Sequence, residues 1–312
     1  MANPENGLQP VSPATVLGEI AAAVPADCRG NIIVIGSLAV AYHYRDRLRR
    51  MAVRTKDADC LLSPRVKAIP SGVAIADQLL DADWTFKGTP GHPAPGTKRT
   101  PIKDLPAVRL QPPNQSEWFI ELLTVPSSSE DRTLRWTRLE TKHGHFALPS
   151  FGFLSLANLD PLPTDMGIFI ARPEMMALAN LLEHPEISSE TMTGGFGGRP
   201  EIKRSNKDLG RVLAIARLAI ARDEDVLQSW PALWKTALQT RFRKEWRTLA
   251  GRVGQGLRTL LANEPGLEQA HFTCNNGLLA GMPPTLQQLK IVGQRLLQDA
   301  IVPVETEARQ SE

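Results

Sequence analysis

The stretch Thr55-Lys-Asp-Ala-Asp-Cys-Leu-Leu62 decides how this chain folds and what chemistry it can carry. Its apolar residues alternate with polar ones, which is typical of a strand with one face packed inward. Asp57 and Asp59 are two positions apart, so on a strand both carboxylates project from the same side of the sheet. Paired carboxylates suit a shared divalent cation, because hard cations prefer oxygen ligands. The stretch therefore predicts a strand that carries a magnesium site, and the alternative is a solvated strand edge.

A second strand and a helix are predicted immediately before this stretch. Asn31-Ile-Ile-Val-Ile-Gly36 is a short apolar run that ends at glycine, and the spacing over Leu38–Met51 is helical. Gly36 and Ser37 thus lie where a strand turns into a helix. The free backbone N–H groups and the dipole of a helix start favour bound phosphate. We expect a phosphate group at this turn.

A third carboxylate lies in a later strand. Trp118-Phe-Ile-Glu-Leu-Leu-Thr-Val125 is apolar on both faces except at Glu121. An unpaired charge there would cost several kcal/mol, so Glu121 needs a cation. A metal shared with the aspartate pair would supply it, and so would a buried ion pair with Arg54 or Arg109.

Composition and length favour a soluble protein with more than one domain. The chain has 312 residues, of which 42% are hydrophobic and 22% charged, and a net charge of +3. Its three cysteines are far apart, which disfavours a disulfide framework or a zinc site. We find no secretory signal and no apolar run of membrane-spanning length, so we expect a cytoplasmic protein with no membrane partner.

Helical patterns dominate the second half of the chain. They cover Pro173–Glu183, Asp208–Ala221, Trp234–Leu249 and Leu286–Leu297, and the tail after Pro303 is expected to be frayed. The predicted fold class is therefore α/β (α+β), with a small mixed sheet flanked by helices and then an α-helical domain. We place the domains at 1–160 and 161–312.

Apolar residues, three of them aromatic, recur every four positions within one predicted helix, at Trp234, Leu238, Phe242 and Trp246, among lysines and arginines. Aromatic and basic side chains together suggest nucleic-acid binding. An apolar stripe at this spacing is more often the buried face of an amphipathic helix, and we favour that interpretation.

Three smaller patterns have simpler explanations. Gly88–Pro106 is rich in proline and glycine and predicts a long irregular loop. His143 and His145 flank a glycine in a predicted hairpin, without the further ligands that zinc needs. The glycine run Gly194–Gly198 lacks the lysine of a phosphate-binding loop and is interpreted as a connector.

The order of the polar motifs is more specific than any motif alone. A strand ending in Gly36-Ser37, one helix, a strand with Asp57 and Asp59, and a later strand with Glu121 follow one another. This order resembles the nucleotidyltransferase fold of the DNA polymerase beta superfamily over roughly the first half of the chain.

That resemblance implies roles for these five residues. Asp57 and Asp59 would bind two Mg²⁺ ions, and Glu121 would complete the catalytic metal site and help to deprotonate the attacking hydroxyl. Gly36 and Ser37 would hold the triphosphate of a nucleoside triphosphate (NTP). The reaction would be two-metal, in-line transfer of a nucleotide to a hydroxyl.

Within the superfamily the chain looks most like the AbiEii-type, toxin–antitoxin-associated branch, because Lys207-Asp208 follows a Pro-led helix at the start of another. This implies that Lys207 reaches the triphosphate and that Asp208 orients Lys207 or the acceptor, with Lys56 as a further cation. The simpler alternative is a helix start whose aspartate suits the dipole. The branch also implies a toxin–antitoxin or phage-defence component with an antitoxin protein as partner.

The acceptor is left open between an RNA 3′ end, a protein and a small molecule. One competing function is a non-catalytic protein of this fold that binds RNA or a protein partner. Another is a haloacid-dehalogenase phosphatase, which Cys60 and the Gly36-Ser37 turn fit poorly.

Overall fold

The computed structural model describes residues 11–48, 53–113, 118–128, 130–184, 191–193 and 201–310. It is a mixed α/β structure with a helical C-terminal region, which confirms the predicted fold class. Contacts divide the chain into two compact units. The sheet unit consists of Val11–Ala39 and Thr55–Arg172, and the helical unit consists mainly of Val40–Arg54 and Pro173–Glu312.

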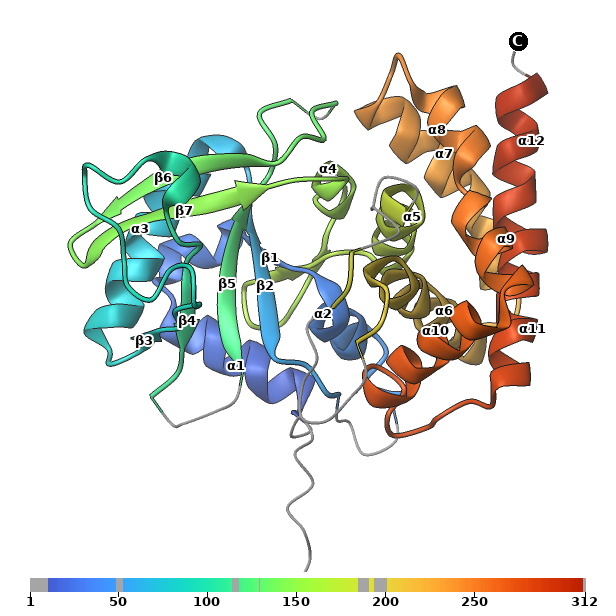
Figure 1. Ribbon diagram of the computed structural model, residues 1–312, viewed down its shortest axis with the longest axis horizontal. Helices are drawn as coiled ribbons and strands as arrows, with labels where there is room; N and C mark the ends of the chain where they lie inside the picture. The colour runs from blue at the N-terminus through green and yellow to red at the C-terminus, as the bar shows by residue number, and fades with distance from the viewer. Residues whose placement is uncertain are drawn as a thin grey trace, which may run out of the picture. The chain divides into compact units, whose positions relative to one another are not determined.

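The sheet unit is built on one seven-stranded sheet with the order β3-β4-β5-β2-β1-β9-β8. Figure 1 shows its central strands β1, β2 and β5 side by side. The pairs β2–β5 and β1–β9 are parallel, and the other pairs are antiparallel. The strands are β1 (Ile32–Val34), β2 (Asp57–Leu62), β3 (Thr85–Phe86), β4 (Arg109–Gln111), β5 (Phe119–Thr124), β8 (Leu162–Pro163) and β9 (Phe169–Ile170).

The three predicted strands are confirmed as β1, β2 and β5, and all three are in the centre of the sheet. The other four strands have only two or three residues each, too few to show a periodic pattern. β8 and β9 follow the predicted boundary between residues 160 and 161, and they belong to the same sheet.

Helices and a hairpin complete the sheet unit. α3 (Arg65–Asp81) packs against β2, β4 and β5 of the sheet and against β6 (Arg135–Thr141) of the hairpin. Gly72 of α3 lies where leucines of β2 and of the hairpin meet, so this glycine allows close packing. The remaining elements are α1 (Pro13–Ala23), α4 (Leu154–Ala157), the second hairpin strand β7 (Gly144–Ser150), and the first half of α2 (Gly36–His43), whose residues from Val40 on belong to the helical unit.

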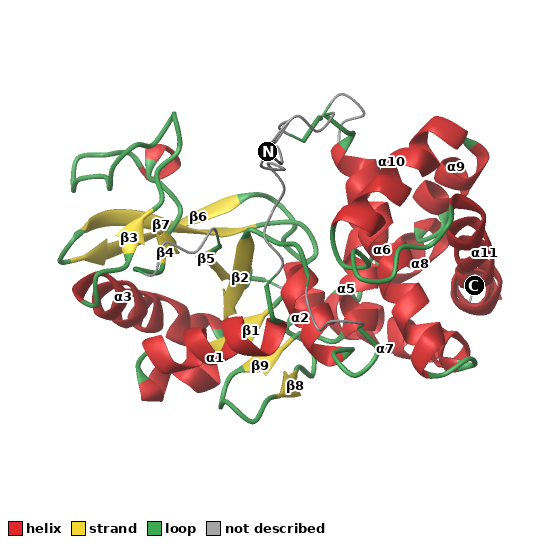
Figure 2. Cartoon of the chain, turned by 90° about the horizontal axis from the view of Figure 1, so that it is seen from below, coloured by secondary structure: helices red, strands yellow, loops and turns green. Residues whose placement is uncertain are grey.

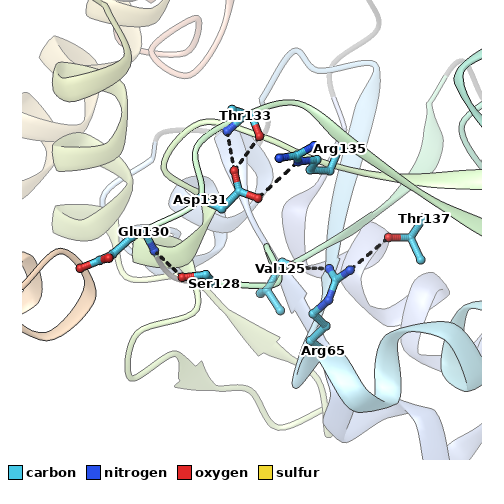
Figure 3. Close-up of polar contacts among 8 residues, drawn as sticks. All are labelled: Arg65, Val125, Ser128, Glu130, Asp131, Thr133, Arg135 and Thr137. Carbon is cyan, nitrogen blue, oxygen red and sulfur yellow. Dashed lines mark hydrogen bonds and ion pairs between the residues drawn. The ribbon is translucent and has the colours of Figure 1, made fainter.

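The segment between β5 and β6 is held by polar contacts (Figure 3). Arg65, the first residue of α3, donates hydrogen bonds to Val125 O at 2.8 Å and to Thr137 Oγ1 at 3.4 Å. The side chain of Asp131 accepts hydrogen bonds from the Thr133 N–H and hydroxyl, which lower the pKa of Asp131. Arg65 thus ties the start of α3 to the residue that follows β5 and to a residue within β6.

The loop over 88–106 is irregular, as predicted, and it is bonded to the hairpin. Gly96 and His145 exchange backbone hydrogen bonds of 2.8 and 3.0 Å, and Arg138 donates to Thr100 O. The predicted hairpin at His143 and His145 is confirmed. His143 Nε2 lies 3.0 Å from the Asp81 carboxylate, so this histidine ties the hairpin turn to the end of α3.

The helical unit is organised around α6 (Arg204–Arg222), which contacts α5, α9, α10 and α11. Figure 2 shows α6 and α10 next to each other. Apolar residues line α6 on most sides, which explains its central position. The other helices are α5 (Pro173–Glu183), α7 (Trp230–Arg241), α8 (Trp246–Arg252), α9 (Gln255–Ala262), α10 (Glu264–Asn276), α11 (Leu286–Leu296) and α12 (Val302–Gln310).

Two predictions for this unit are wrong. The helix predicted over Trp234–Leu249 is two helices, because the chain leaves the helical conformation at Phe242 with φ −132° and ψ 56°. The tail after Pro303 is helical in α12 rather than frayed, because Val304 and Ala308 are buried there. The glycine run over 194–198 lies outside the described residues.

Three of the four residues of this stripe are core, as favoured, whereas Trp246 is half-buried and has Arg247 over its ring. Trp234, Leu238 and Phe242 are fully buried, and the indole N–H of Trp234 donates to Glu174 O at 2.9 Å. Their aromatic faces are therefore not available for bases. No described helix is both long and apolar enough to cross a membrane.

Close packing of α6 on α10 gives a first prediction. A Cβ on Gly210 would lie 2.7 Å from Ala270 O, whereas a Cβ on Gly251 of α8 would meet no atom within 4 Å. Gly210→Val should therefore lower the free energy of unfolding by about 2–3 kcal/mol, because the two helices must separate. Gly251→Ala, the matched control, should raise it by up to about 0.5–1 kcal/mol. Urea unfolding measures both, and equal stabilities would contradict the packing described.

Candidate active site

The acidic residues predicted from the sequence meet in one row of the sheet. Asp59 of β2 is directly opposite Glu121 of β5, and Glu121 is directly opposite Arg109 of β4. Opposite residues on neighbouring strands project to the same face. Asp57, two residues before Asp59, projects to that face as well, opposite Phe119. The sheet thus brings all three carboxylates to one face.

The aspartate pair belongs to a strand whose other face is packed. Asp57 and Asp59 are half-buried, while Ala58 and Cys60 between and after them are buried. The Thr55 hydroxyl donates to Asp57 Oδ1 at 3.0 Å and holds this carboxylate. Burial raises the pKa of the Cys60 thiol, so Cys60 is protonated and is a packing residue, not a nucleophile.

Gly36 lies beside Asp59. It is the first residue of α2 and has φ +74°, a conformation that favours glycine. A Cβ built on Gly36 would lie 3.2 Å from Asp59 Oδ2. Ser37 is the next residue of the helix and is half-buried. The start of α2, where we expect a phosphate group, therefore lies against Asp59, which we expect to bind the metal.

This close approach gives a second prediction. Gly36→Ala should reduce the proposed transfer activity by about ten- to a hundredfold, because the new methyl group both strains the backbone and displaces the Asp59 carboxylate. Gly30→Ala is the control, since a Cβ there meets no atom within 4 Å. Rates of label transfer by the two folded variants test the prediction, and equal rates would count against a role for the turn.

Glu121 is held by an arginine. Arg109 Nε donates to Glu121 Oε2 at 2.8 Å and Arg109 Nη2 to Glu121 Oε1 at 3.2 Å, a bidentate pair. The Glu121 side chain is 14% exposed and the Arg109 side chain 34%. This is one of the two ion pairs that the sequence left open for Glu121.

Two cations flank the row on the side of β3 and β4. Lys87 Nζ lies 4.6 Å from the centre of the Phe119 ring, and Arg109 Cζ lies 6.0 Å from it. The Lys87 N–H donates to Arg109 O at 2.8 Å, so Lys87 continues the same row. Sequence reasoning missed Lys87, because β3, which it directly follows, has only two residues and shows no pattern. Phe119 belongs to a predicted strand, but its contact with Lys87 depends on strand pairing, which no local pattern encodes.

The donor set suits magnesium at the aspartate pair. Within the described residues, no group of three or more His, Cys, Asp or Glu side chains is placed to hold a metal ion. The bidentate contact with Arg109 explains why Glu121 does not complete such a group. Magnesium is usually held by one or two carboxylates together with water and substrate phosphates, so Asp57 and Asp59 fit it without a third ligand.

Lys207 and Asp208 are in the first two turns of α6, in the helical unit. Asp208 is buried, and its carboxylate lies 3.4 Å from Arg211 Nη1 and 3.9 Å from Arg204 Nε. These ion pairs within one helix satisfy the Asp208 charge. Lys207 is half-buried.

Lys56 directly precedes β2. Its carbonyl accepts the Phe119 N–H at 2.9 Å, so its backbone extends the pairing of β2 with β5, and its side chain is half-buried.

A search of protein families, curated proteins and solved structures finds no match to this chain.

Proposed function

We propose that this chain is a magnesium-dependent nucleotidyltransferase that moves a nucleoside monophosphate from an NTP to a hydroxyl acceptor and releases pyrophosphate. The observation that carries the proposal is the juxtaposition of Asp59 with Gly36 at the start of α2, where the Cβ position is 3.2 Å from Oδ2. A carboxylate for a cation and a helix start for a phosphate are the two halves of a metal–triphosphate site.

Each group has a distinct task in this proposal. Asp57 and Asp59 hold magnesium, which neutralises charge on the triphosphate. Gly36 and Ser37 bind the phosphate chain through the N–H groups of the helix start, and the glycine lets the chain approach the backbone. Lys56 adds positive charge. Glu121 accepts the proton of the attacking hydroxyl once its carboxylate is free of Arg109.

The partners follow from the chemistry. An NTP and two Mg²⁺ ions are required, and the acceptor is an RNA 3′ end, a protein or a small molecule. Lys207 and Asp208 are kept as candidates for contacts to the triphosphate or the acceptor. A toxin role with an antitoxin protein as partner rests on the resemblance to the AbiEii-type branch alone.

One observation favours a second function. Glu121 is already paired with Arg109, as in a protein that keeps the fold without the chemistry. Such a protein would bind RNA or a protein partner and would transfer nothing.

Label transfer separates the two functions. Purified protein is incubated with magnesium and each NTP, labelled at the α- or the γ-phosphate, together with total RNA and a protein extract. Transfer of the α-label with release of pyrophosphate supports the proposal and identifies the acceptor. Release of inorganic phosphate without α-label transfer indicates a phosphohydrolase, and no reaction of folded protein with any NTP indicates the non-catalytic function.

A further inference from the structure

Charges of opposite sign occupy the two halves of one row in the sheet. Lys87 and Arg109 supply the positive half, on the side of β3 and β4, and Glu121 and Asp59 supply the negative half, on β5 and β2. Arg109 and Glu121 meet at the middle of the row. The boundary between the two halves is thus an ion pair that includes a carboxylate of the proposed metal site.

Burial makes this ion pair necessary in the absence of metal. Glu121 is mostly buried in a strand whose neighbouring residues Ile120 and Leu122 are core. A carboxylate in that position must be paired, and the bidentate guanidinium satisfies both of its oxygens.

Arg109 itself is less dependent on the pair. Its side chain is more exposed than that of Glu121. Its guanidinium carbon also lies 6.0 Å from the centre of the Phe119 ring, to which Lys87 Nζ is closer at 4.6 Å. The free-energy cost of exposing the Arg109 guanidinium to solvent would therefore be smaller than the cost of leaving the Glu121 carboxylate unpaired.

We propose that Arg109 is the resident counter-ion of Glu121, and that Arg109 and a divalent cation compete for this carboxylate. The inference rests on the proposed function, because it takes the aspartate pair as the metal site. Arg109 is then a positioning residue. It keeps Glu121 in place while the site is empty, and its displacement lets Glu121 join the aspartates.

Removal of a competitor strengthens binding. Arg109→Gln should therefore bind Mn²⁺ about tenfold more tightly than the wild type, as measured by electron paramagnetic resonance of free Mn²⁺. In a Glu121→Gln background the same substitution should have no effect on affinity, since the contested carboxylate is gone. Arg135→Gln is the matched control, because Arg135 pairs with Asp131 at an exposed position of the same unit.

Thermal unfolding supplies a readout apart from activity. Without metal, Arg109→Gln should lower the melting temperature, because Glu121 is left unpaired. Saturating Mn²⁺ should restore the melting temperature to that of the wild type with Mn²⁺. An arginine with a purely structural role would lower the melting temperature with and without Mn²⁺ and would not change Mn²⁺ affinity.

The outcomes separate this inference from the proposed function. Mn²⁺ binding that needs Asp57 and Asp59 but is equal or weaker in Arg109→Gln overturns the inference and leaves the function standing. Tighter Mn²⁺ binding by Arg109→Gln supports the inference, even where the wild type transfers no nucleotide and the function itself has to be abandoned.

Discussion

Asp57→Asn and Asp59→Asn should each reduce nucleotidyl transfer by at least about a thousandfold, because each removes a negative ligand from the proposed metal site. Asparagine keeps the volume of aspartate, and the apolar side chains of β2 that pack the core are unchanged. Label transfer measures activity, and circular dichroism checks that both variants are folded.

Asp160→Asn is a suitable control for these variants. Asp160 is an exposed residue of the sheet unit with φ 47°, which asparagine tolerates, and it pairs with Arg172. Loss of this surface pair should leave transfer unchanged. Full activity of Asp57→Asn and Asp59→Asn would remove the aspartate pair from the mechanism.

Arg258→Ala should lower the free energy of unfolding by about 3 kcal/mol, because it leaves a buried carboxylate without its bidentate partner. Glu305 of α12 is only 2% exposed and accepts hydrogen bonds from Arg258 Nη1 at 2.8 Å, Arg258 Nη2 at 2.6 Å and Gly254 N at 3.1 Å. Without Arg258 a buried carboxylate would keep a single close donor. The free energy of unfolding in urea measures the loss.

A second arginine near the same carboxylate provides the control. Arg309 is 3.9 Å from Glu305 Oε2, and its side chain is 74% exposed. Arg309→Ala should therefore cost less than about 0.5 kcal/mol. Similar losses for both arginines would show that the bidentate geometry does not govern the energy of this cluster. Arg258→Met combined with Glu305→Leu should recover most of the loss, because it removes both charges.

The strands of the candidate site were predictable because they are long enough to show a pattern. Asp57 and Asp59 are separated by one buried residue, and Glu121 interrupts an otherwise apolar run. Period-two alternation then fixes the face of each carboxylate. The register that sets Asp59 opposite Glu121 is a tertiary property, and no local pattern encodes it.

The remaining features depend on contacts between distant segments. The sequence offered Arg54 and Arg109 equally as partners of Glu121, and strand pairing selected Arg109. The helix break at Phe242 has no proline or glycine to announce it, and the four-residue spacing of apolar residues continues through the bend to Trp246. Helix α12 was missed because its buried Glu305 looks like a solvated charge until its partner is known.

The division of the chain into two units limits where the gene for this protein can recombine and still encode a folded product. The helical unit takes in Val40–Arg54, which lies between the two segments of the sheet unit, so neither unit is one continuous stretch. Ile33 pairs with Phe169, so the sheet is completed only when a late segment returns to an early one. A crossover near residue 160 would separate β8 and β9 from β1. Exchange of a whole C-terminal half between related genes should therefore yield misfolded chimaeras, whereas exchange of the loop over 88–106 would leave the order of the strands intact.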